Sequence, residues 1–214
     1  MSAYPTVRFL LSANHAQQFP GDSGVEVAVA GRSNAGKSSA LNAITQRQGL
    51  ARTSKTPGRT QLINFFELAP GRRLVDLPGY GYAKVPPRMR AHWQELVGGY
   101  LETRNSLTGL LLIVDCRRAL NDDDRGLIAW ARQRGRRLHV LLTKSDKLTR
   151  HEARQQLRQV ASELDGGATV QLFSAVSKEG VEEARHALQA LLENKKNPVA
   201  RLTEPPGQTN PAWG

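Results

Sequence analysis

The sequence predicts an α/β fold: a doubly wound domain of three layers, whose six-stranded, mostly parallel sheet carries one antiparallel edge strand from a hairpin. Three observations support this prediction. Short apolar runs alternate with segments of helical periodicity. Residues 109–115 are apolar without alternation, as in parallel strands covered on both faces. The polar motifs follow the ends of these runs, and ligands bind at the carboxyl ends of strands in such sheets.

The composition suits one folded domain with a basic surface. A chain of 214 residues with 39% hydrophobic residues can build one substantial core. Its 30 Lys and Arg residues against 19 Asp and Glu give a net charge of +11. Such a surplus favours a polyanionic partner such as RNA, with a merely solvated basic surface as the alternative.

The chain also has features typical of a cytoplasmic protein. Cys116 is the only cysteine, so no internal disulfide can form and a reducing compartment is the simpler assumption. This cysteine ends an apolar strand and is expected to be buried. The first residues lack the pattern of a secretory signal, and no apolar run approaches the roughly 18 residues that span a bilayer. We expect a monomer that does not insert into membranes.

Turn signals and composition divide the chain into three segments. Residues 1–23 form an N-terminal extension expected to pack on the domain, because Pro20-Gly21-Asp22 marks a boundary before the first core strand. Residues 24–195 form the folded domain. Residues 196–214 are rich in Pro, Asn, Thr and Gly, which predicts a disordered tail.

The first half of the domain begins with a buried strand over residues 25–30, which are apolar and β-branched, and continues with a helix over 38–44. Residues 48–59 are polar and basic, contain a Pro-Gly pair and lack apolar periodicity, which predicts a mobile loop. Residues 61–68 and 73–76 have strand composition on either side of a Pro-Gly turn. They predict a hairpin.

The second half alternates helices with strands. A helix is predicted from Pro87 to about Arg104, because proline is tolerated in a first turn and apolar residues recur at helical spacing. Those residues, expected in the core, are Trp93, Leu96, Val97, Tyr100 and Leu101. The acids in 121–124 suit the start of a helix that runs to Arg134 better than a metal site. The remaining predictions are strands over 109–115, 138–143 and 169–173 and helices over 149–164 and 181–193.

The most informative motif is a glycine loop between the first predicted strand and helix. It has the pattern G-x-x-x-x-G-K-[ST] and comprises Gly31, Arg32, Ser33, Asn34, Ala35, Gly36, Lys37 and Ser38, followed by Ser39. Its backbone N–H groups and the helix N-terminus suit a polyphosphate. Lys37 would reach the β- and γ-phosphates as a catalytic cation, and Ser38 would bind Mg²⁺. The alternative is a glycine turn without a ligand.

A second motif predicts the base. Thr143-Lys144-Ser145-Asp146 follows the fifth predicted strand, and the Asp146 carboxylate can accept two hydrogen bonds from the N–H groups of guanine. Adenine lacks donors in that arrangement, so the site would reject it. The Lys144 stem would lie along the base. The last residue of the sixth strand and those that follow it would complete the base pocket, with the Ala175 N–H donating to the guanine carbonyl; they are Phe173, Ser174, Ala175 and Val176.

Two further segments suit the γ-phosphate and Mg²⁺. Asp76-Leu77-Pro78-Gly79 would hold Mg²⁺ through a water on Asp76 and sense the γ-phosphate through the Gly79 N–H. Thr60 would complete the Mg²⁺ shell and act in catalysis, within a segment that comprises Gly58, Arg59, Thr60, Gln61 and Leu62. The loops around Thr60 and Tyr80 are expected to order with GTP and to loosen with GDP.

The strings G-R-S-N-A-G-K-S-S, T-P-G-R-T-Q, D-L-P-G-Y-G-Y-A and T-K-S-D, in this spacing, resemble the EngB (YihA or YsxC) family of bacterial GTPases in the TrmE–Era superfamily. The likeness runs from about Phe9 to Leu192. It implies a P-loop GTPase domain and a Mg²⁺-dependent GTP-binding protein. The resemblance also implies that the protein assists assembly of the large ribosomal subunit and is needed for normal cell division and septation.

One position departs from better-known small GTPases. Tyr80 stands where a glutamine commonly orients the attacking water, which predicts weak intrinsic hydrolysis that a partner or a cation accelerates. Asn34 matches an asparagine that helps hold K⁺ beside the phosphates in potassium-activated relatives. An asparagine chosen for turn geometry explains the same residue equally well.

Two functional hypotheses remain open at the level of sequence. In the first, GTP and GDP states differ in affinity for a ribosomal particle, and hydrolysis releases the protein. In the second, the nucleotide is structural and the basic surface holds RNA. The candidates for that surface are Arg132, Arg134, Arg136, Arg137, Arg150, Arg154 and Arg158. An ATPase or small-molecule kinase is disfavoured by Asp146.

Overall fold

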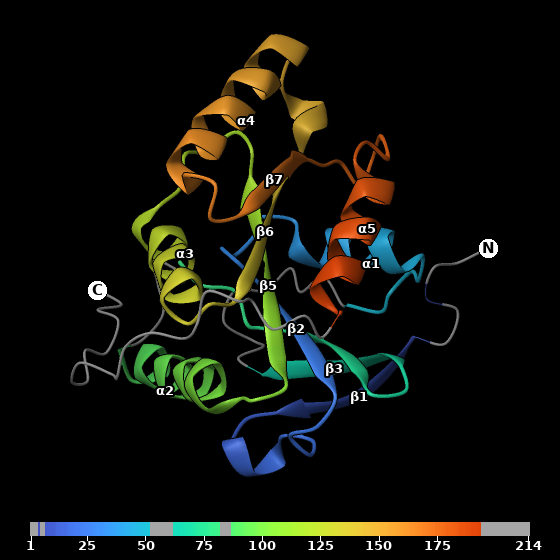
Figure 1. Ribbon diagram of the computed structural model, residues 1–214, viewed down its shortest axis with the longest axis vertical. Helices are drawn as coiled ribbons and strands as arrows, with labels where there is room; N and C mark the ends of the chain where they lie inside the picture. The colour runs from blue at the N-terminus through green and yellow to red at the C-terminus, as the bar shows by residue number, and fades with distance from the viewer. Residues whose placement is uncertain (1–3, 5–6, 52–61, 82–86, 194–214) are drawn as a thin grey trace.

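The computed structural model describes residue 4 and residues 7–51, 62–81 and 87–193, with the side chains of 87–93 left out. Its described part contains one sheet with helices on both faces (Figure 1). The strands are β1 (Arg8–Ala13), β2 (Val25–Gly31), β3 (Ile63–Ala69), β4 (Arg72–Asp76), β5 (Leu107–Asp115), β6 (Arg137–Thr143) and β7 (Thr169–Leu172). The helices are η1 (Ala16–Gln18), α1 (Lys37–Thr45), α2 (Pro87–Thr103), α3 (Asp122–Gln133), η2 (Ser145–Lys147), α4 (Arg150–Leu164) and α5 (Val181–Leu191).

The doubly wound α/β class predicted from the sequence is confirmed. The strand order is β1-β3-β4-β2-β5-β6-β7, and the pairs from β4 through β2, β5 and β6 to β7 are parallel. The sheet has seven strands in the described part of the chain, where six were predicted. The additional strand, β1, lies within the predicted N-terminal extension and pairs antiparallel with β3 at the edge of the sheet. Because β3 is itself antiparallel to β4, β3 alone of the seven strands described runs against the others.

Two apolar layers fix the sheet between its helices. In Figure 1, α2, α3 and α4 cover one face, and α1 and α5 cover the other. Tyr100, Leu127 and Val160 are buried on the first face, and Leu41 and Leu188 on the second. The central strands β2, β5 and β6 are buried along most of their length, because helices cover both of their faces.

The predicted helix starts are confirmed by their caps. Asn121 accepts a hydrogen bond from the Asp124 N–H, and the Asp124 carboxylate accepts one from the Asn121 N–H, which is a capping box. Thr149 and Glu152 form the same arrangement at α4. The acids at 121–124 therefore start a helix, as the sequence predicted.

A buried charged cluster crosses the sheet at its amino end. Glu26 on β2 is fully buried. Its Oε1 accepts hydrogen bonds from Arg73 Nε at 2.7 Å and Arg104 Nη2 at 2.7 Å. Its Oε2 accepts from Arg104 Nε at 2.8 Å and from the Tyr100 hydroxyl at 3.0 Å. The cluster ties β2 to β4 and to the end of α2.

Some predictions cannot be compared with the structure. The disordered tail at 196–214 and most of the mobile loop at 48–59 lie outside the described residues, as does the side chain of Trp93. Cys116 is buried as predicted, and burial raises the pKa of its thiol to about 11. Among the helices that the structure describes, none is both long and apolar enough to cross a bilayer.

Candidate functional site

The glycine loop joins β2 to α1 in a geometry that only small residues allow. A side chain at Gly31 would place its Cβ 2.5 Å from the carbonyl oxygen of Ile113 on β5. Gly36 has a φ of 97°, which L side chains rarely adopt, and it immediately precedes the first residue of α1. Asn34 is also left-handed, with a φ of 63°. The loop therefore wraps the start of α1 closely enough for a ligand to approach its backbone.

Lys37 and Asp76 meet beside this loop. The Lys37 Nζ donates to the Asp76 carboxylate in an ion pair whose side chains are only 13% and 9% exposed. Asp76 ends β4, which lies next to β2, and the Leu77 N–H donates to the Val29 carbonyl at 3.0 Å. Ser38 follows Lys37 in the first turn of α1. A cation and a carboxylate thus lie together at the carboxyl ends of two parallel strands, and a serine follows the cation in the sequence.

The segment after Asp76 reaches the same loop. The Ser33 N–H donates to the Tyr80 carbonyl at 2.8 Å, and Arg32 forms a β-bridge with Tyr80. A Cβ at Gly79 would lie 3.3 Å from the Ser33 Cα and backbone nitrogen. The backbone of Gly79 therefore lies against the glycine loop, as a sensor of the γ-phosphate requires.

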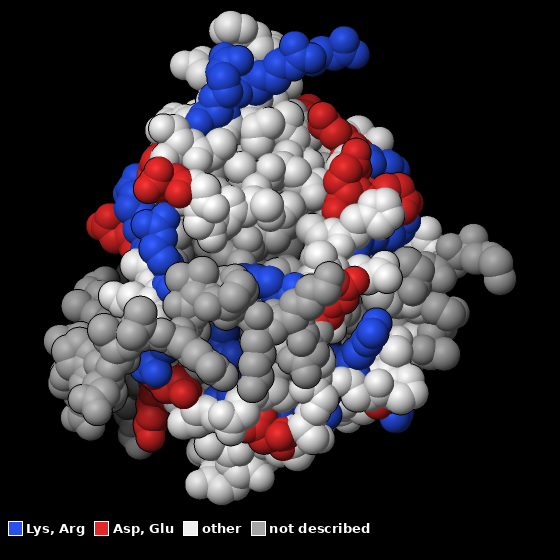
Figure 2. All heavy atoms as spheres, viewed as in Figure 1, with Lys and Arg blue, Asp and Glu red and all other residues white. Residues whose placement is uncertain are grey.

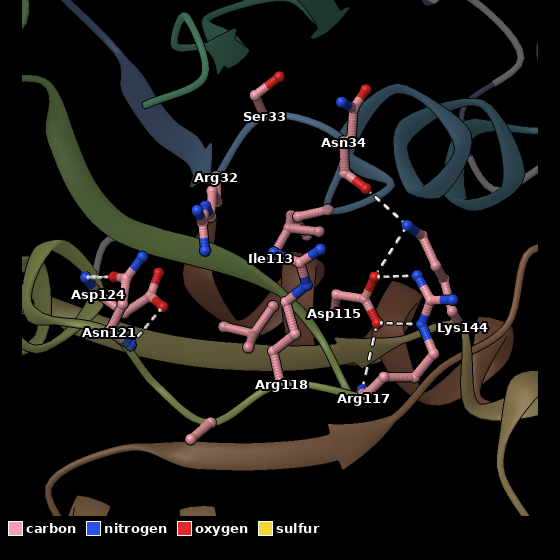
Figure 3. A pocket seen from close by; sticks show the side chains of 13 residues that line it. Arg32, Ser33, Asn34, Ile113, Asp115, Arg117, Arg118, Asn121, Asp124 and Lys144 are labelled. Atoms are coloured by element: carbon pink, nitrogen blue, oxygen red, sulfur yellow. Dashed lines mark hydrogen bonds and ion pairs between the residues drawn. The ribbon is translucent and has the colours of Figure 1, made fainter. Parts of the chain in front are cut away.

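The base motif is bound directly to the glycine loop. The Thr143 hydroxyl donates to the carbonyls of Ala35 and Val114. Lys144 Nζ donates to the Asn34 carbonyl at 2.6 Å and to an Asp115 carboxylate oxygen at 2.9 Å (Figure 3). The Lys144 side chain thereby spans the distance between the base motif and the phosphate loop. A nucleotide bound to both would be held by one connected structure.

Asp146 is held in the charged state that guanine recognition needs. Its Oδ1 accepts a hydrogen bond from the Ser174 hydroxyl at 2.6 Å, and this bond, together with Lys147 at 3.3 Å, lowers the pKa of the Asp146 carboxyl. The Ser174 Oγ in turn accepts from the Val176 N–H at 3.2 Å. A carboxylate ionised at neutral pH has two oxygens free of protons to accept from a base edge.

The other residues predicted for the base pocket surround this pair unevenly. Phe173 is fully buried, and its carbonyl accepts a hydrogen bond from the Ser145 N–H at 3.3 Å. Its backbone therefore holds the base motif in place. Ala175 is partly buried, and Val176 is 78% exposed.

The residues predicted for the γ-phosphate and Mg²⁺ can be compared with the structure only in part. Leu77 is buried in the core. Gly58, Arg59, Thr60 and Gln61 lie outside the described residues.

Sequence reasoning missed Asp115. Burial alone would raise its pKa, but hydrogen bonds from Arg117 at 2.9 Å and 2.7 Å, and from Lys144, hold the pKa well below its usual range. This carboxylate orients the Lys144 stem. An acid at the end of an otherwise apolar strand was the signal that could have identified it, because polar side chains at that edge face the ligand.

The sequence also predicts a role for Asp124 only at the start of α3. Besides capping α3, its carboxylate accepts a hydrogen bond from the Tyr80 hydroxyl. Burial raises the pKa of both groups. Tyr80 is 5% exposed, so its side chain lies in the protein interior, where its hydroxyl bonds to Asp124.

Comparisons with known proteins agree with this geometry. The family described as "50S ribosome-binding GTPase" matches residues 26–144. A "Probable GTP-binding protein EngB" from Stenotrophomonas maltophilia (strain K279a) is 53% identical over 182 residues, covering 83% of this chain and 91% of its own. One with the same name from Escherichia coli O157:H7 is 50% identical over 199 residues, covering 92% and 94%.

Solved structures support the fold. The crystal structure of a probable GTP-binding protein engB matches with a TM-score of 0.64 and 21% identity, covering 80% of this chain and 100% of its own. A crystal structure of a variant of Aquifex aeolicus Era, bound to GDP.AlF4-, matches with a TM-score of 0.61 and 17% identity, covering 78% and 56%. At these identities the likeness concerns the fold.

Proposed function

Because the chain belongs to the EngB family of GTP-binding proteins, we propose that it is a GTP-controlled factor for assembly of the large ribosomal subunit. In this proposal the GTP-bound protein binds the subunit, and hydrolysis to GDP releases it. The main observation behind the proposal is the link between the base motif and the phosphate loop. Ser174 holds Asp146 ionised, and Lys144, in the same motif, donates to the Asn34 carbonyl of the phosphate loop. This connection makes one unit of guanine and phosphate recognition.

The residues of the phosphate site fit a magnesium polyphosphate. Mg²⁺ in such sites is bound by one or two protein oxygens together with substrate phosphates, and Ser38 and Asp76 supply that pair. When bound, Mg²⁺ would neutralise charge that develops on the phosphate oxygens. Lys37 would exchange its Asp76 partner for phosphate oxygens. The loop N–H groups would orient the phosphates, with Asp76 then free to hold the metal through water.

Weak intrinsic hydrolysis is part of the proposal. A residue that orients the attacking water needs a free polar group beside the γ-phosphate. The Tyr80 hydroxyl instead donates to the buried Asp124. This contact supports a GTPase that depends on its partner, or on a cation, for a useful rate.

Potassium is proposed as that cation, bound at Asn34. Asn34 is exposed on the phosphate loop, and its left-handed φ equally suits a turn without a metal role. We expect GTP turnover to rise at least about tenfold when K⁺ replaces Na⁺ at equal ionic strength, since one well-placed cation lowers a barrier by about 1.4 kcal/mol or more. The measurement is phosphate release in the two salts, repeated with Asn34→Ala. Equal rates in both salts would remove potassium from the mechanism.

We propose that only part of the arginine set predicted from the sequence contacts RNA. Four of its seven arginines serve the fold: Arg132 donates to the Leu164 carbonyl, Arg134 pairs with Glu102, Arg136 donates to the Arg104 carbonyl, and Arg137 donates to carbonyls at the end of α5. The three that remain share one face of α4, because they recur every four residues; they are Arg150, Arg154 and Arg158.

Those three side chains form the proposed RNA surface. All are exposed, and no ion pair joins them to a carboxylate within the described ranges. Figure 2 shows Lys and Arg gathered at the top of the view, over the end of the molecule where α4 lies in Figure 1. Unpaired cations in a row favour a phosphate backbone over a neutral partner.

Sedimentation with purified large ribosomal subunits tests the proposal. We expect co-sedimentation with a non-hydrolysable GTP analogue and at least about tenfold weaker binding with GDP, because a useful switch needs roughly 1.4 kcal/mol or more between its states. Rising salt should weaken both complexes. Equal binding with either nucleotide would favour the nucleotide-stabilised RNA module, and no binding at all would contradict the proposed partner.

The cellular setting is proposed on the same basis. The protein would act in the cytoplasm as a monomer, where ribosomal subunits are assembled. The role in cell division and septation implied by the family resemblance would then follow from the supply of ribosomes.

A further inference from the structure

A second pocket lies on the side of the phosphate loop that faces the start of α3. Its volume is about 100 Å³, and it is lined by loop residues 32–35, the end of β5 and residues 117–121 (Figure 3). A water occupies about 30 Å³ in the liquid, and drug-sized ligands need several hundred. The pocket therefore suits one small group, and the exposed residues 117–119 open it to solvent.

The charges that line this pocket are unbalanced. Asp115 accepts two hydrogen bonds from the Arg117 side chain and one from Lys144, so two cations already share it. Both carboxylate oxygens of Asp124 are engaged, by the Tyr80 hydroxyl and the Asn121 N–H. Both carboxylates are thus already hydrogen-bonded to groups other than the two remaining cations of the pocket.

Arg32 and Arg118 are those cations. Figure 3 shows their side chains extending into the pocket from opposite walls, one from the phosphate loop and one from the loop after β5. Arg32 affects Asp124 through charge alone, and in the described part of the chain neither guanidinium has a carboxylate in an ion pair. Two like charges facing one confined space repel each other unless an anion lies between them.

We infer that this pocket binds a phosphate group, with the guanidinium groups of Arg32 and Arg118 as its two donors. Guanidinium presents pairs of N–H groups that match phosphate oxygens, and these charge-assisted bonds are among the strongest that proteins form. The phosphate could be presented by an RNA backbone or by a small free phosphate compound. The choice of RNA as the source rests on the function proposed above, whereas the inference that the pocket binds a phosphate group does not.

The pocket also lies next to the segment that is proposed to sense the γ-phosphate. Arg32 forms a β-bridge with Tyr80, and a Cβ at Gly81 would lie 2.9 Å from the Arg32 side chain. Tyr80 and Gly81 directly follow Gly79, the proposed γ-phosphate sensor. A movement of this segment would therefore shift Arg32, so phosphate in the pocket and GTP in the loop should affect each other's affinity, each by the same factor.

Sulfate titration tests the pocket directly. The protein is first saturated with Mg²⁺ and a non-hydrolysable GTP analogue, so that the phosphate loop is filled. Sulfate binding is then followed through the arginine Nε–Hε resonances. We expect saturable shifts of Arg32 and Arg118, and at least about tenfold weaker binding in Arg118→Gln, because the variant loses a charge-assisted hydrogen bond to the anion.

Arg72→Gln is the matched control, since it removes the same charge from an exposed position on β4, outside both the pocket and the proposed RNA surface. It should leave sulfate binding unchanged. Equal sulfate affinity in Arg118→Gln and Arg72→Gln, or no saturable shift of the pocket arginines, would overturn the inference. Retained affinity for the GTP analogue shows that Arg118→Gln is folded.

Competition identifies the source of the phosphate. Displacement of sulfate from Arg118 by a short single-stranded RNA supports the RNA backbone. Displacement by inorganic pyrophosphate but not by RNA supports a free phosphate compound and excludes the RNA source. Failure of the ribosome proposal is seen separately, as absence of co-sedimentation by the wild-type protein, and does not alter the sulfate result.

Discussion

Asp146→Asn is expected to lower the affinity for GTP and GDP by up to about 10⁴-fold, because a site built to pair with specific base donors loses that much when the pairing fails. The ionised carboxylate presents acceptors to both guanine N–H groups. An amide presents one acceptor and one donor, so one guanine donor would face another donor. The measurement is the equilibrium affinity for each nucleotide with Mg²⁺ present.

Two controls separate base recognition from damage to the fold. Xanthine carries a carbonyl where guanine has its amino group, so Asp146→Asn should bind xanthosine nucleotides better than the wild type does. Ser174→Ala removes the hydroxyl that donates to Asp146 at 2.6 Å and should weaken GTP binding by only about tenfold, the worth of one charge-assisted bond. A normal GTP affinity in Asp146→Asn would contradict the assignment of the base site.

The phosphate loop and the base motif could be predicted because each is short and continuous in sequence. The turn at Gly36 and the helix that begins at Lys37 follow from local backbone chemistry. What the sequence did not reveal is how the motifs touch. Lys144 reaches the Asn34 carbonyl across 110 positions of the chain, a contact that depends on β2 and β6 lying on either side of β5.

Strand β1 escaped prediction for a related reason. Edge strands bury little, and Phe9 is 53% exposed, so residues 8–13 lack the strong apolar pattern of the central strands. The strand forms because β3 offers unpaired backbone groups. Arg8 adds an exposed ion pair with Glu67, with side chains 65% and 27% exposed. The sequence predicts that this extension packs on the domain but does not predict that it pairs as a strand.

Glu26 is the clearest case of a residue whose role needs the structure. Within the run 25–30 it interrupts an otherwise apolar pattern, and nothing nearby in sequence neutralises it. Its partners Arg73 and Arg104 lie 47 and 78 positions further along the chain. Only the sheet brings them together, so a buried carboxylate that local reasoning would reject becomes fully hydrogen-bonded.

Glu26→Ala should therefore destabilise the protein by about 3–5 kcal/mol, because it removes the buried carboxylate that neutralises Arg73 and Arg104 and leaves Arg104 only its longer ion pair with Asp22, at 3.6 Å. Such a loss is a large fraction of the roughly 5–15 kcal/mol that stabilises a typical domain. The measurement is the free energy of unfolding in urea, with Glu26→Gln as a variant of equal size that retains part of the hydrogen bonding. Glu67→Ala is the matched control and should cost about 1 kcal/mol or less, since its pair with Arg8 is exposed to solvent.

The affinity for nucleotide should not fall with the stability, because Glu26 lies at the opposite end of β2 from Gly31. At the rise per residue of a strand, the two residues are about 16 Å apart. Folded Glu26→Gln is thus expected to bind GTP normally while it unfolds at lower urea. Equal unfolding free energies for Glu26→Ala and Glu67→Ala would contradict the buried cluster. A Glu26→Gln protein that is as stable as the wild type but binds GTP poorly would instead place Glu26 in communication with the nucleotide site.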